Sequence, residues 1–239
     1  MTLDIMKKFG VNVLKGFYIK HDDCTKEHKS CRIDEFKVKR QSYIPCDYTV
    51  EGDYSSASYL LAAIAINGGH ARVLNLFKNS KQGDKLILEI LEKMGADITV
   101  HEDYVEISSD GNLNGIDINL SNAPDLLITV AVLAAMADGT TNITGVKHAR
   151  VKETDRIDTT CRQLEKLNCK LEEFEDGMSI TGGVTGGVVD SCGDHRLAMA
   201  FSLIGLKHDI EIVNGEVFDV SFPNFIEAMA EIGLELELV

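Results

Sequence analysis

The segment from Arg150 to Ile157 holds the densest group of side chains able to do chemistry. It contains two arginines, a lysine and two carboxylates, and it lies between a strand-like run and a helix-like run. Charge at this density in a connection predicts a segment outside the core. Thr154 or Asp155 is expected to cap the following helix, which places Arg156 in its first turn. A cation there opposes the helix dipole by about 0.3–1 kcal/mol, so Arg156 is expected to serve something other than stability.

Two further positions place chemical groups at the start of an apolar helix. Pro124 suits the first helical position, so Asp125 is expected in the first turn, ionised and able to accept a hydroxyl proton or bind a diol. A carboxylate that only compensates the dipole is the alternative for Asp125. The second position is Asp194 with Arg196. Arg156 and Arg196 at helix starts fit a phosphate or carboxylate ligand, and an Asp194–Arg196 surface pair is the alternative.

Composition limits the class of protein. The formal net charge of the 239 residues is −14, from 24 basic and 38 acidic side chains, which disfavours nucleic acid and anionic membranes as partners. A small anionic substrate stays possible, because a few local cations can dominate a pocket. The longest apolar runs, 59–66 and 128–137, are too short to cross a bilayer, and no signal-peptide pattern opens the chain, so a cytoplasmic protein is expected.

The six cysteines form no C-x-x-C pair, which favours reduced thiols. One cluster raises the question of zinc: His21, Cys24, His28 and Cys31. Its spacing matches no standard set of zinc ligands, so a solvated loop is the favoured interpretation and no metal is expected.

The chain repeats one pattern: an apolar helix, a strand, an amphipathic helix and two short strands. The first copy is predicted at 53–67, 70–76, 82–94, 97–100 and 104–108, with Gly95 ending its second helix. The second copy is predicted at 125–137, 141–146, 155–167, 170–174 and 178–181, with Asn168 at the equivalent stop. The third copy is predicted at 194–206, 209–213, 224–232 and 234–238, with Gly233 as its stop. An aspartate opens the apolar helix of each copy: Asp53, Asp125 and Asp194. Three such copies predict an α/β (α+β) domain with pseudo-threefold symmetry.

The N-terminal residues match only the second half of a copy. A helix at 2–9, Gly10 and strands at 11–14 and 17–20 are expected there, followed by a linker over 21–47 with an exposed strand at 35–39. The first half of that copy is missing, so the chain is expected to be N-terminally truncated. The predicted domains are therefore residues 1–50, the tail of a preceding domain with its crossover, and residues 51–239.

The chain resembles the 5-enolpyruvylshikimate-3-phosphate synthase family, the 3-phosphoshikimate 1-carboxyvinyltransferases. The resemblance lies in motifs that follow one another along the whole chain: Glu51-Gly52-Asp53-Tyr54-Ser55-Ser56-Ala57, Asn79-Ser80-Lys81-Gln82-Gly83-Asp84, Pro124-Asp125, Arg150 to Ile157, Asp194-His195-Arg196-Leu197-Ala198-Met199 and Ser221-Phe222-Pro223. It implies two domains of three βαβαββ units each, closing on substrates, and most of the N-terminal domain would be absent from this chain. The full-length protein is expected to be monomeric.

The resemblance also implies an activity. The family transfers the enolpyruvyl group of phosphoenolpyruvate to the 5-hydroxyl of shikimate 3-phosphate, releasing phosphate without a metal or other cofactor, on the route to chorismate and aromatic amino acids. By motif, Asp125 contacts shikimate hydroxyls and accepts a proton, Lys152 and Glu153 lie at the reacting centre, and Lys152 also touches shikimate 3-phosphate. Arg156 and Arg196 hold phosphoenolpyruvate, and Asp194 supports that site.

Two positions depart from the family pattern. Val220 stands where some members carry a lysine that binds phosphoenolpyruvate, and His148, a candidate substrate contact, stands where an asparagine is common. Without the missing half the chain is expected to be inactive. Two alternatives stay open: a UDP-N-acetylglucosamine enolpyruvyl transferase, against which the motifs at 150–157 and 221–223 argue, and a non-catalytic structural fragment.

Overall fold

The computed structural model describes residues 1–21 and 30–237, and this part of the chain packs as two units, Met1–Val50 and Glu51–Val239. Cys24 and His28 of the zinc alternative lie outside the described residues. Within the described ranges, no group of three or more His, Cys, Asp or Glu side chains could hold a metal ion. The same ranges contain no helix that is long and apolar enough to span a membrane.

The smaller unit is a short helix followed by a long two-stranded ribbon. Helix α1 (Thr2–Lys8) has no buried residue, and the antiparallel strands β1 (Val13–His21) and β2 (Ser30–Val38) pair from Val13↔Val38 to His21↔Ser30. The two strands expected at 11–14 and 17–20 are thus one strand, and the expected linker contains its partner. The exposed strand expected at 35–39 lies mostly within β2, but the length of the two strands and their pairing were missed, because a two-stranded ribbon is held by backbone hydrogen bonds rather than by a buried face.

The larger unit contains three groups of elements. The first group comprises α2 (Tyr54–Asn67), β3 (Gly69–Leu74), the 3-10 helix η1 (Gly83–Leu86), α3 (Ile87–Met94), β4 (Asp97–Val100) and β5 (Tyr104–Ser109). The second comprises β6 (Asp117–Asn119), η2 (Pro124–Leu126), α4 (Leu127–Ala135), β7 (Thr140–Thr144), η3 (Lys147–Val151), α5 (Arg156–Lys166), β8 (Lys170–Phe174) and β9 (Gly177–Thr181). The third comprises β10 (Gly187–Asp190), α6 (His195–Ser202), η4 (Leu203–Leu206), β11 (Ile210–Val213), η5 (Gly215–Val220) and α7 (Phe225–Glu231).

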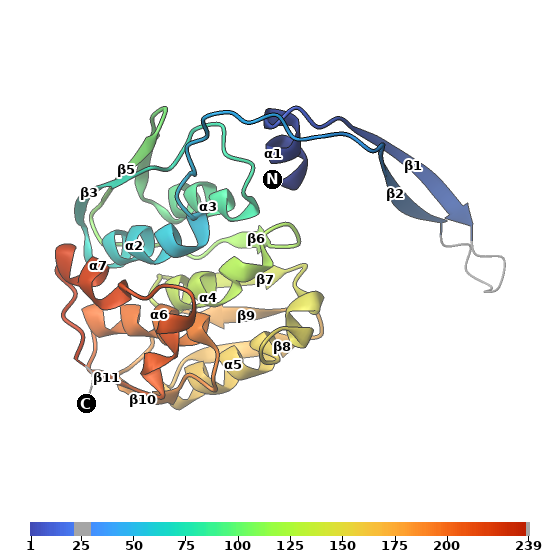
Figure 1. Cartoon of the computed structure of the whole chain (residues 1–239). Coiled ribbons are helices and arrows are strands. Elements are labelled where there is room, and N and C mark those ends of the chain that lie inside the picture. The colour runs from blue at the N-terminus through green and yellow to red at the C-terminus, as the bar shows by residue number, and fades with distance from the viewer. Residues whose placement is uncertain (22–29, 238–239) are drawn as a thin grey trace. The chain divides into compact units, whose positions relative to one another are not determined.

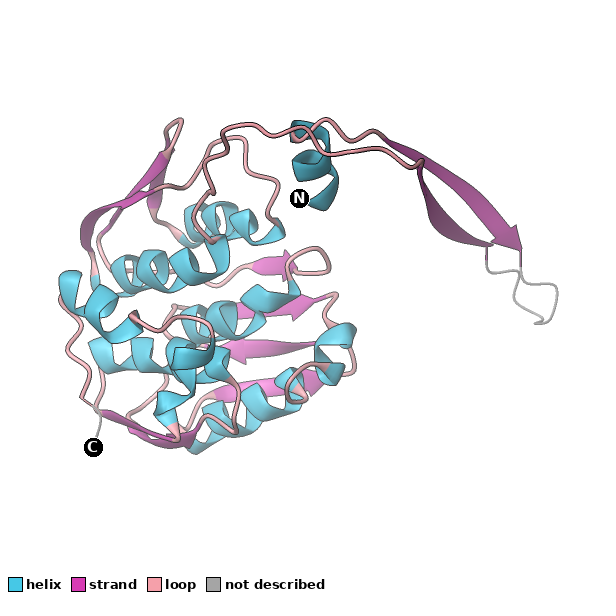
Figure 2. Ribbon diagram, in the orientation of Figure 1, coloured by secondary structure: helices cyan, strands magenta, loops and turns pink. Residues whose placement is uncertain are grey.

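Helices α2, α4 and α6 form the centre of the larger unit, where α4 packs against both of the others (Figure 1). All nine residues of α4 are buried. A helix that is apolar all round must lie inside the protein, which is why α4 could be recognised as central from sequence. The sheets β3-β5-β4 and β6-β7-β9-β8 and the pair β10-β11 belong to successive groups (Figure 2).

The three groups share backbone details that support their equivalence. In each, the amide shortly before the central helix donates to the carbonyl at the end of the following strand: Gly52 to Asn75 at 2.7 Å, Leu120 to Thr144 at 2.9 Å and Ser191 to Val213 at 3.1 Å. In each, a residue with positive φ follows the outer helix: Gly95 at 116°, Asn168 at 59° and Gly233 at 90°. The predicted repeat and its three stop positions are therefore confirmed.

Three details of the predicted repeat are wrong. The short parallel strands β6 and β10, which open the second and third units, were missed because three or four residues carry too little pattern. Helices α3 and α4 begin in 3-10 turns and α6 ends in one, so these three segments are not single α-helices. The expected strand at 234–238 is not a strand over its described residues 234–237. Leu234 there is only 5% exposed, so its apolar character reflects packing against the core rather than strand pairing.

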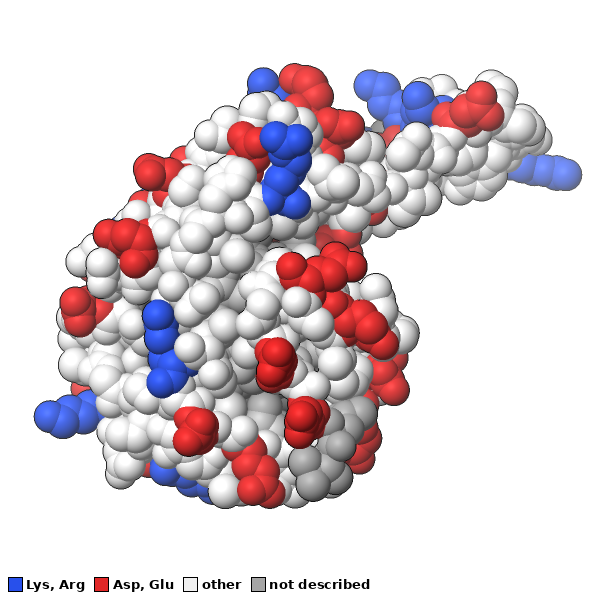
Figure 3. Space-filling model, turned by 90° about the vertical axis from the view of Figure 1, so that its left-hand side faces the viewer, with Lys and Arg blue, Asp and Glu red and all other residues white. Residues whose placement is uncertain are grey.

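Acidic side chains are spread over the face shown in Figure 3, with fewer basic ones among them. This distribution agrees with the net charge of −14. Against such a surface a buried cation is unusual, and the first turn of α5 contains one, Arg156, whose side chain is 1% exposed.

Candidate active site

The start of helix α5 positions the central cation. Of the two N-cap candidates from the sequence, the structure selects Asp155, whose side chain accepts a hydrogen bond from the Asp158 amide at 3.1 Å. Arg156 is therefore the first helical residue, as expected. The expectation that this charged segment lies outside the core is wrong for Arg156, whose side chain is 1% exposed. Arg150 has a structural role, because its guanidinium binds Asp155 at 2.9 Å and Glu173 at 2.7 Å.

Carboxylates from three directions surround the Arg156 guanidinium. Its Nε donates to Asp194 Oδ2 at 2.7 Å, and Nη2 donates to Asp194 Oδ1 at 3.3 Å. Nη1 donates to Asp125 Oδ1 at 2.9 Å, and Nη2 lies 2.6 Å from Glu153 Oε2. Such charge-assisted bonds explain how a guanidinium can be buried, because every buried charge needs a partner.

Asp194 is fully buried and serves two elements at once. It caps helix α6 by accepting from the Arg196 amide at 3.0 Å, and it forms the two bonds to Arg156 described above. The alternative of an Asp194–Arg196 surface pair is wrong, because Asp194 is 0% exposed and its ion-pair partner is Arg156. Asp53, at the equivalent position of the first unit, only caps: its carboxylate accepts from the Ser55 and Ser56 amides at 3.1 Å.

Asp125 is the shared counter-ion of three cations. Besides Arg156, it lies 3.4 Å from Lys152 Nζ and 3.4 Å from Arg196 Nη2, and its side chain is 30% exposed. Burial raises the pKa of this carboxyl, but Arg196, Lys152 and Arg156 together outweigh burial and lower it below the ordinary aspartate value. Asp125 is therefore held ionised, as expected, although by neighbouring cations as well as by any effect of the helix start.

Six of the seven predicted site residues lie close together, at or just before the starts of helices α4, α5 and α6. Asp125, Lys152, Glu153, Arg156, Asp194 and Arg196 form this group, which we call the Arg156 cluster. His148 lies in η3 with an exposed side chain and makes none of the contacts given above. Val220 is 74% exposed.

Two neighbours of the cluster were missed from sequence. Asp84, in η1, accepts a hydrogen bond from Ser55; burial raises the pKa of its carboxyl, and the charges of Asp125 and Arg196 also act on it. Tyr59 of α2 lies beside Arg196, whose charge partly offsets the rise in the phenol pKa caused by burial. The segment 79–84 was recognised as one of the motifs of the family resemblance, but no role was assigned to Asp84. Tyr59 gave no signal, since a tyrosine in an apolar helix resembles any core residue.

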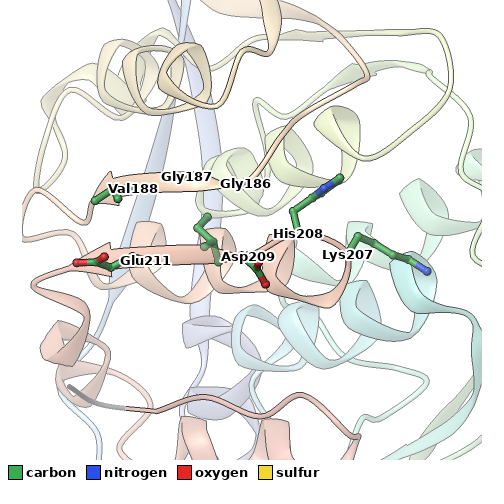
Figure 4. Close-up of a pocket in the computed structure, with 8 residues that line it drawn as sticks. Gly186, Gly187, Val188, Lys207, His208, Asp209 and Glu211 are labelled. Atoms are coloured by element: carbon green, nitrogen blue, oxygen red, sulfur yellow. The ribbon is translucent and has the colours of Figure 1, made fainter.

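A separate surface depression lies at the amino ends of the parallel strands β10 and β11, whereas Asp194 follows the carboxyl end of β10 (Figure 4). Its lining carries both signs of charge, from Lys207, Asp209 and Glu211. Mixed charge selects no ionic class of ligand, so the Arg156 cluster is the candidate site.

Comparison with known proteins identifies the relatives of this chain. The family model for EPSP synthase (3-phosphoshikimate 1-carboxyvinyltransferase) matches residues 1–229. The 3-phosphoshikimate 1-carboxyvinyltransferase of Methanobrevibacter smithii is 76% identical over all 239 residues, and that of Methanothermobacter thermautotrophicus is 50% identical over 238. The chain covers 55% and 53% of these two proteins, so it spans about half the length of the curated relatives it matches.

A solved structure gives the same result for the fold. The EPSP synthase of Acinetobacter baumannii superposes with a TM-score of 0.78 at 29% sequence identity, covering 98% of this chain and 54% of that one. The pseudo-threefold α/β architecture is thus an enolpyruvyl transferase-like fold. With the family model matching nearly the whole chain and two relatives at 50% identity or more, the chain belongs to the EPSP synthase (3-phosphoshikimate 1-carboxyvinyltransferase) family.

Proposed function

We propose that this chain supplies the C-terminal half of a 3-phosphoshikimate 1-carboxyvinyltransferase, which transfers the enolpyruvyl group of phosphoenolpyruvate to the 5-hydroxyl of shikimate 3-phosphate. The observation that carries the proposal is the Arg156 cluster, in which one half-buried carboxylate is shared by three cations at 2.9–3.4 Å. Both substrates are anions, and such cations are the groups that bind phosphates and carboxylates. The protein would act as a cytoplasmic enzyme on these small molecules.

The roles of the residues follow from their charges and places. Arg156 and Arg196 would bind phosphoenolpyruvate, and Asp194 would fix the orientation of the Arg156 guanidinium. Lys152 would contact shikimate 3-phosphate, with His148 as a further substrate contact. Asp125 is ionised and next to Lys152, so it suits the acceptance of the proton from the attacking hydroxyl. Glu153, 47% exposed, would move protons at the methylene carbon as phosphate is eliminated.

Charge balance supports a need for residues beyond this chain. The three cations of the cluster already face three carboxylates, with Asp84 nearby as a further acid. A site that is neutral or slightly negative binds a multiply charged anion weakly, so more cations must come from elsewhere. We propose that residues 1–50 are the tail of a second domain, which supplies these cations.

The test uses phosphate release from the two substrates, with this chain alone and with the chain joined to the remaining part of the Methanobrevibacter smithii relative. The joined protein should turn over and the chain alone should not. No turnover by the joined, folded protein would refute the activity, and turnover by the chain alone would refute the need for a second domain. In the joined protein, Asp125→Ala should lower kcat by about 10²–10⁴-fold, the usual contribution of general acid–base catalysis. Asp53→Ala, which removes only a cap, should change kcat by less than about threefold.

A further inference from the structure

Tyr59 has a buried hydroxyl that lies beside the Arg196 guanidinium but forms no hydrogen bond of normal geometry. Its side chain lies in the central helix α2 and is 1% exposed, and its oxygen has no hydrogen-bond partner of normal geometry in the described part of the chain. Burying a hydroxyl without a partner is unfavourable, so such groups are rare and call for an explanation. A phenylalanine would fill the same space without this cost.

Arg196 is the cation beside this hydroxyl. Its guanidinium is 16% exposed, and its ion pair with Asp125 is long, at 3.4 Å. Burial lowers the pKa of the guanidinium, whereas Tyr59, Asp125 and Asp84 raise it and together have the larger effect. A guanidinium has five N–H donors in a fixed plane, and the long contact to Asp125 leaves donors available.

Aromatic packing fixes the direction of the Tyr59 ring. Phe225 of helix α7 meets it edge to face, with ring centroids 5.9 Å apart and an interplanar angle of 86°. Phe225 itself packs against Phe218 at 5.7 Å and against Phe222 at 5.6 Å. Phe222 belongs to the Ser221-Phe222-Pro223 motif, so this motif packs against the Tyr59 ring through Phe225.

We propose that Tyr59 is a positioning residue for Arg196, whose guanidinium donates a hydrogen bond to the Tyr59 oxygen when it turns from Asp125 to an anionic substrate. The bond would fix the plane of the guanidinium and orient its remaining donors. This inference rests on the function proposed above, in which Arg196 binds phosphoenolpyruvate. The Tyr59 oxygen and the Arg196 guanidinium already interact, but without a hydrogen bond of normal geometry, and the proposed turn of the guanidinium would complete that bond.

Tyr54 provides a matched control in the same helix. It is also buried, at 0% exposed, but its hydroxyl donates to the Phe77 carbonyl at 3.3 Å and therefore already has a partner. Tyr54→Phe and Tyr59→Phe remove the same atom from the same helix. Only the second change should affect Arg196.

The experiment uses the protein joined to the remaining part of the relative. Phosphoenolpyruvate binding is measured by calorimetry without shikimate 3-phosphate, and the steady-state constants are measured for both substrates. Tyr59→Phe should raise the Kd and KM for phosphoenolpyruvate about five- to tenfold, with kcat and the KM for shikimate 3-phosphate within twofold of wild type. Tyr54→Phe should leave all of these within twofold and lower the melting temperature. In an Arg196→Lys background, Tyr59→Phe should weaken phosphoenolpyruvate binding by less than twofold.

Each result decides the proposal. A Kd and KM for phosphoenolpyruvate within twofold of wild type in Tyr59→Phe would overturn it, as would an equal effect of Tyr54→Phe or a full effect in the Arg196→Lys background. If the wild-type protein binds phosphoenolpyruvate but does not turn over, the proposed activity fails and the calorimetric comparison still tests Tyr59. If it binds no phosphoenolpyruvate, both proposals fail.

Discussion

Replacing Asp194 by asparagine should reveal the energetic weight of the buried ion pair. Asparagine is as good an N-cap as aspartate, so the cap of α6 is retained and the charge alone is lost. The Arg156 guanidinium, 1% exposed, would then face a neutral amide where it now has a fully buried carboxylate at 2.7 Å. Breaking a buried pair costs about 3–5 kcal/mol. Because Asp125 and Glu153 remain near Arg156, we expect the lower end, about 3 kcal/mol.

The assay is urea unfolding and thermal melting of this chain, with Asp53→Asn as the matched control. Asp53 is the N-cap at the equivalent position of the first unit, and no ion pair of Asp53 is seen in the described part of the chain. Its replacement should cost less than about 0.5 kcal/mol, since asparagine and aspartate cap equally well. At about 2–4 °C per kcal/mol for a chain of this size, Asp194→Asn should lower the melting temperature by about 6–12 °C. Equal destabilisation by the two changes would refute the view that Asp194 neutralises a buried cation.

Three further predictions concern separate parts of the molecule. Because the pKa of Asp125 is lowered in the folded protein, its ion pairs stabilise the fold fully above about pH 4, and this stabilisation is lost as the pH falls through the lowered pKa. An NMR titration of the Asp125 carboxyl with a midpoint at or above the ordinary aspartate value would contradict this. Gly182→Ala should destabilise the fold by about 1–3 kcal/mol in urea, because the new methyl group would overlap a backbone carbonyl oxygen just beyond helix α4. Gly205→Ala, whose methyl group would meet only ordinary contacts, should cost less than this. Burial raises the pKa of the Cys161 thiol to about 12. Iodoacetamide at pH 8 should therefore label the exposed Cys192 in the native protein, and Cys161 only after unfolding. Detection of the label on Cys161 of the native protein by mass spectrometry would refute the burial of this thiol.

Much of the fold could be predicted because the relevant signals are local. Helix α4 is apolar on every side, which only a buried helix tolerates. Thr154 or Asp155 was expected to cap α5, and Asp155 does accept a backbone hydrogen bond from the first turn of that helix. The residues that stop the outer helices could also be recognised, since glycine and asparagine adopt positive φ at low cost. Each of these features depends on a few neighbouring residues.

Other parts of the fold could not be predicted, because their causes lie far away in the chain. The ribbon β1–β2 depends on pairing between segments that are not adjacent in the sequence, and no side chain at 13–17 or 34–38 is buried. Strand β10 exists because β11 lies beside it in parallel, from Gly187↔Ile210 to Asp190↔Val213. Its four residues alone are not distinctive.

For the site, the sequence by itself determined which residues carry the chemistry and that Arg156 and Arg196 stand at helix starts. Only the tertiary structure decided which charges meet. Asp194 pairs with Arg156, 38 residues before it in the chain, rather than with Arg196 beside it. It also decided that Arg156 is buried and that Asp84 and Tyr59 border the cluster. The physical reason is that ion pairing and burial depend on distances in space, set by the packing of α2, α4 and α6 and the helices around them, and no local pattern records those distances.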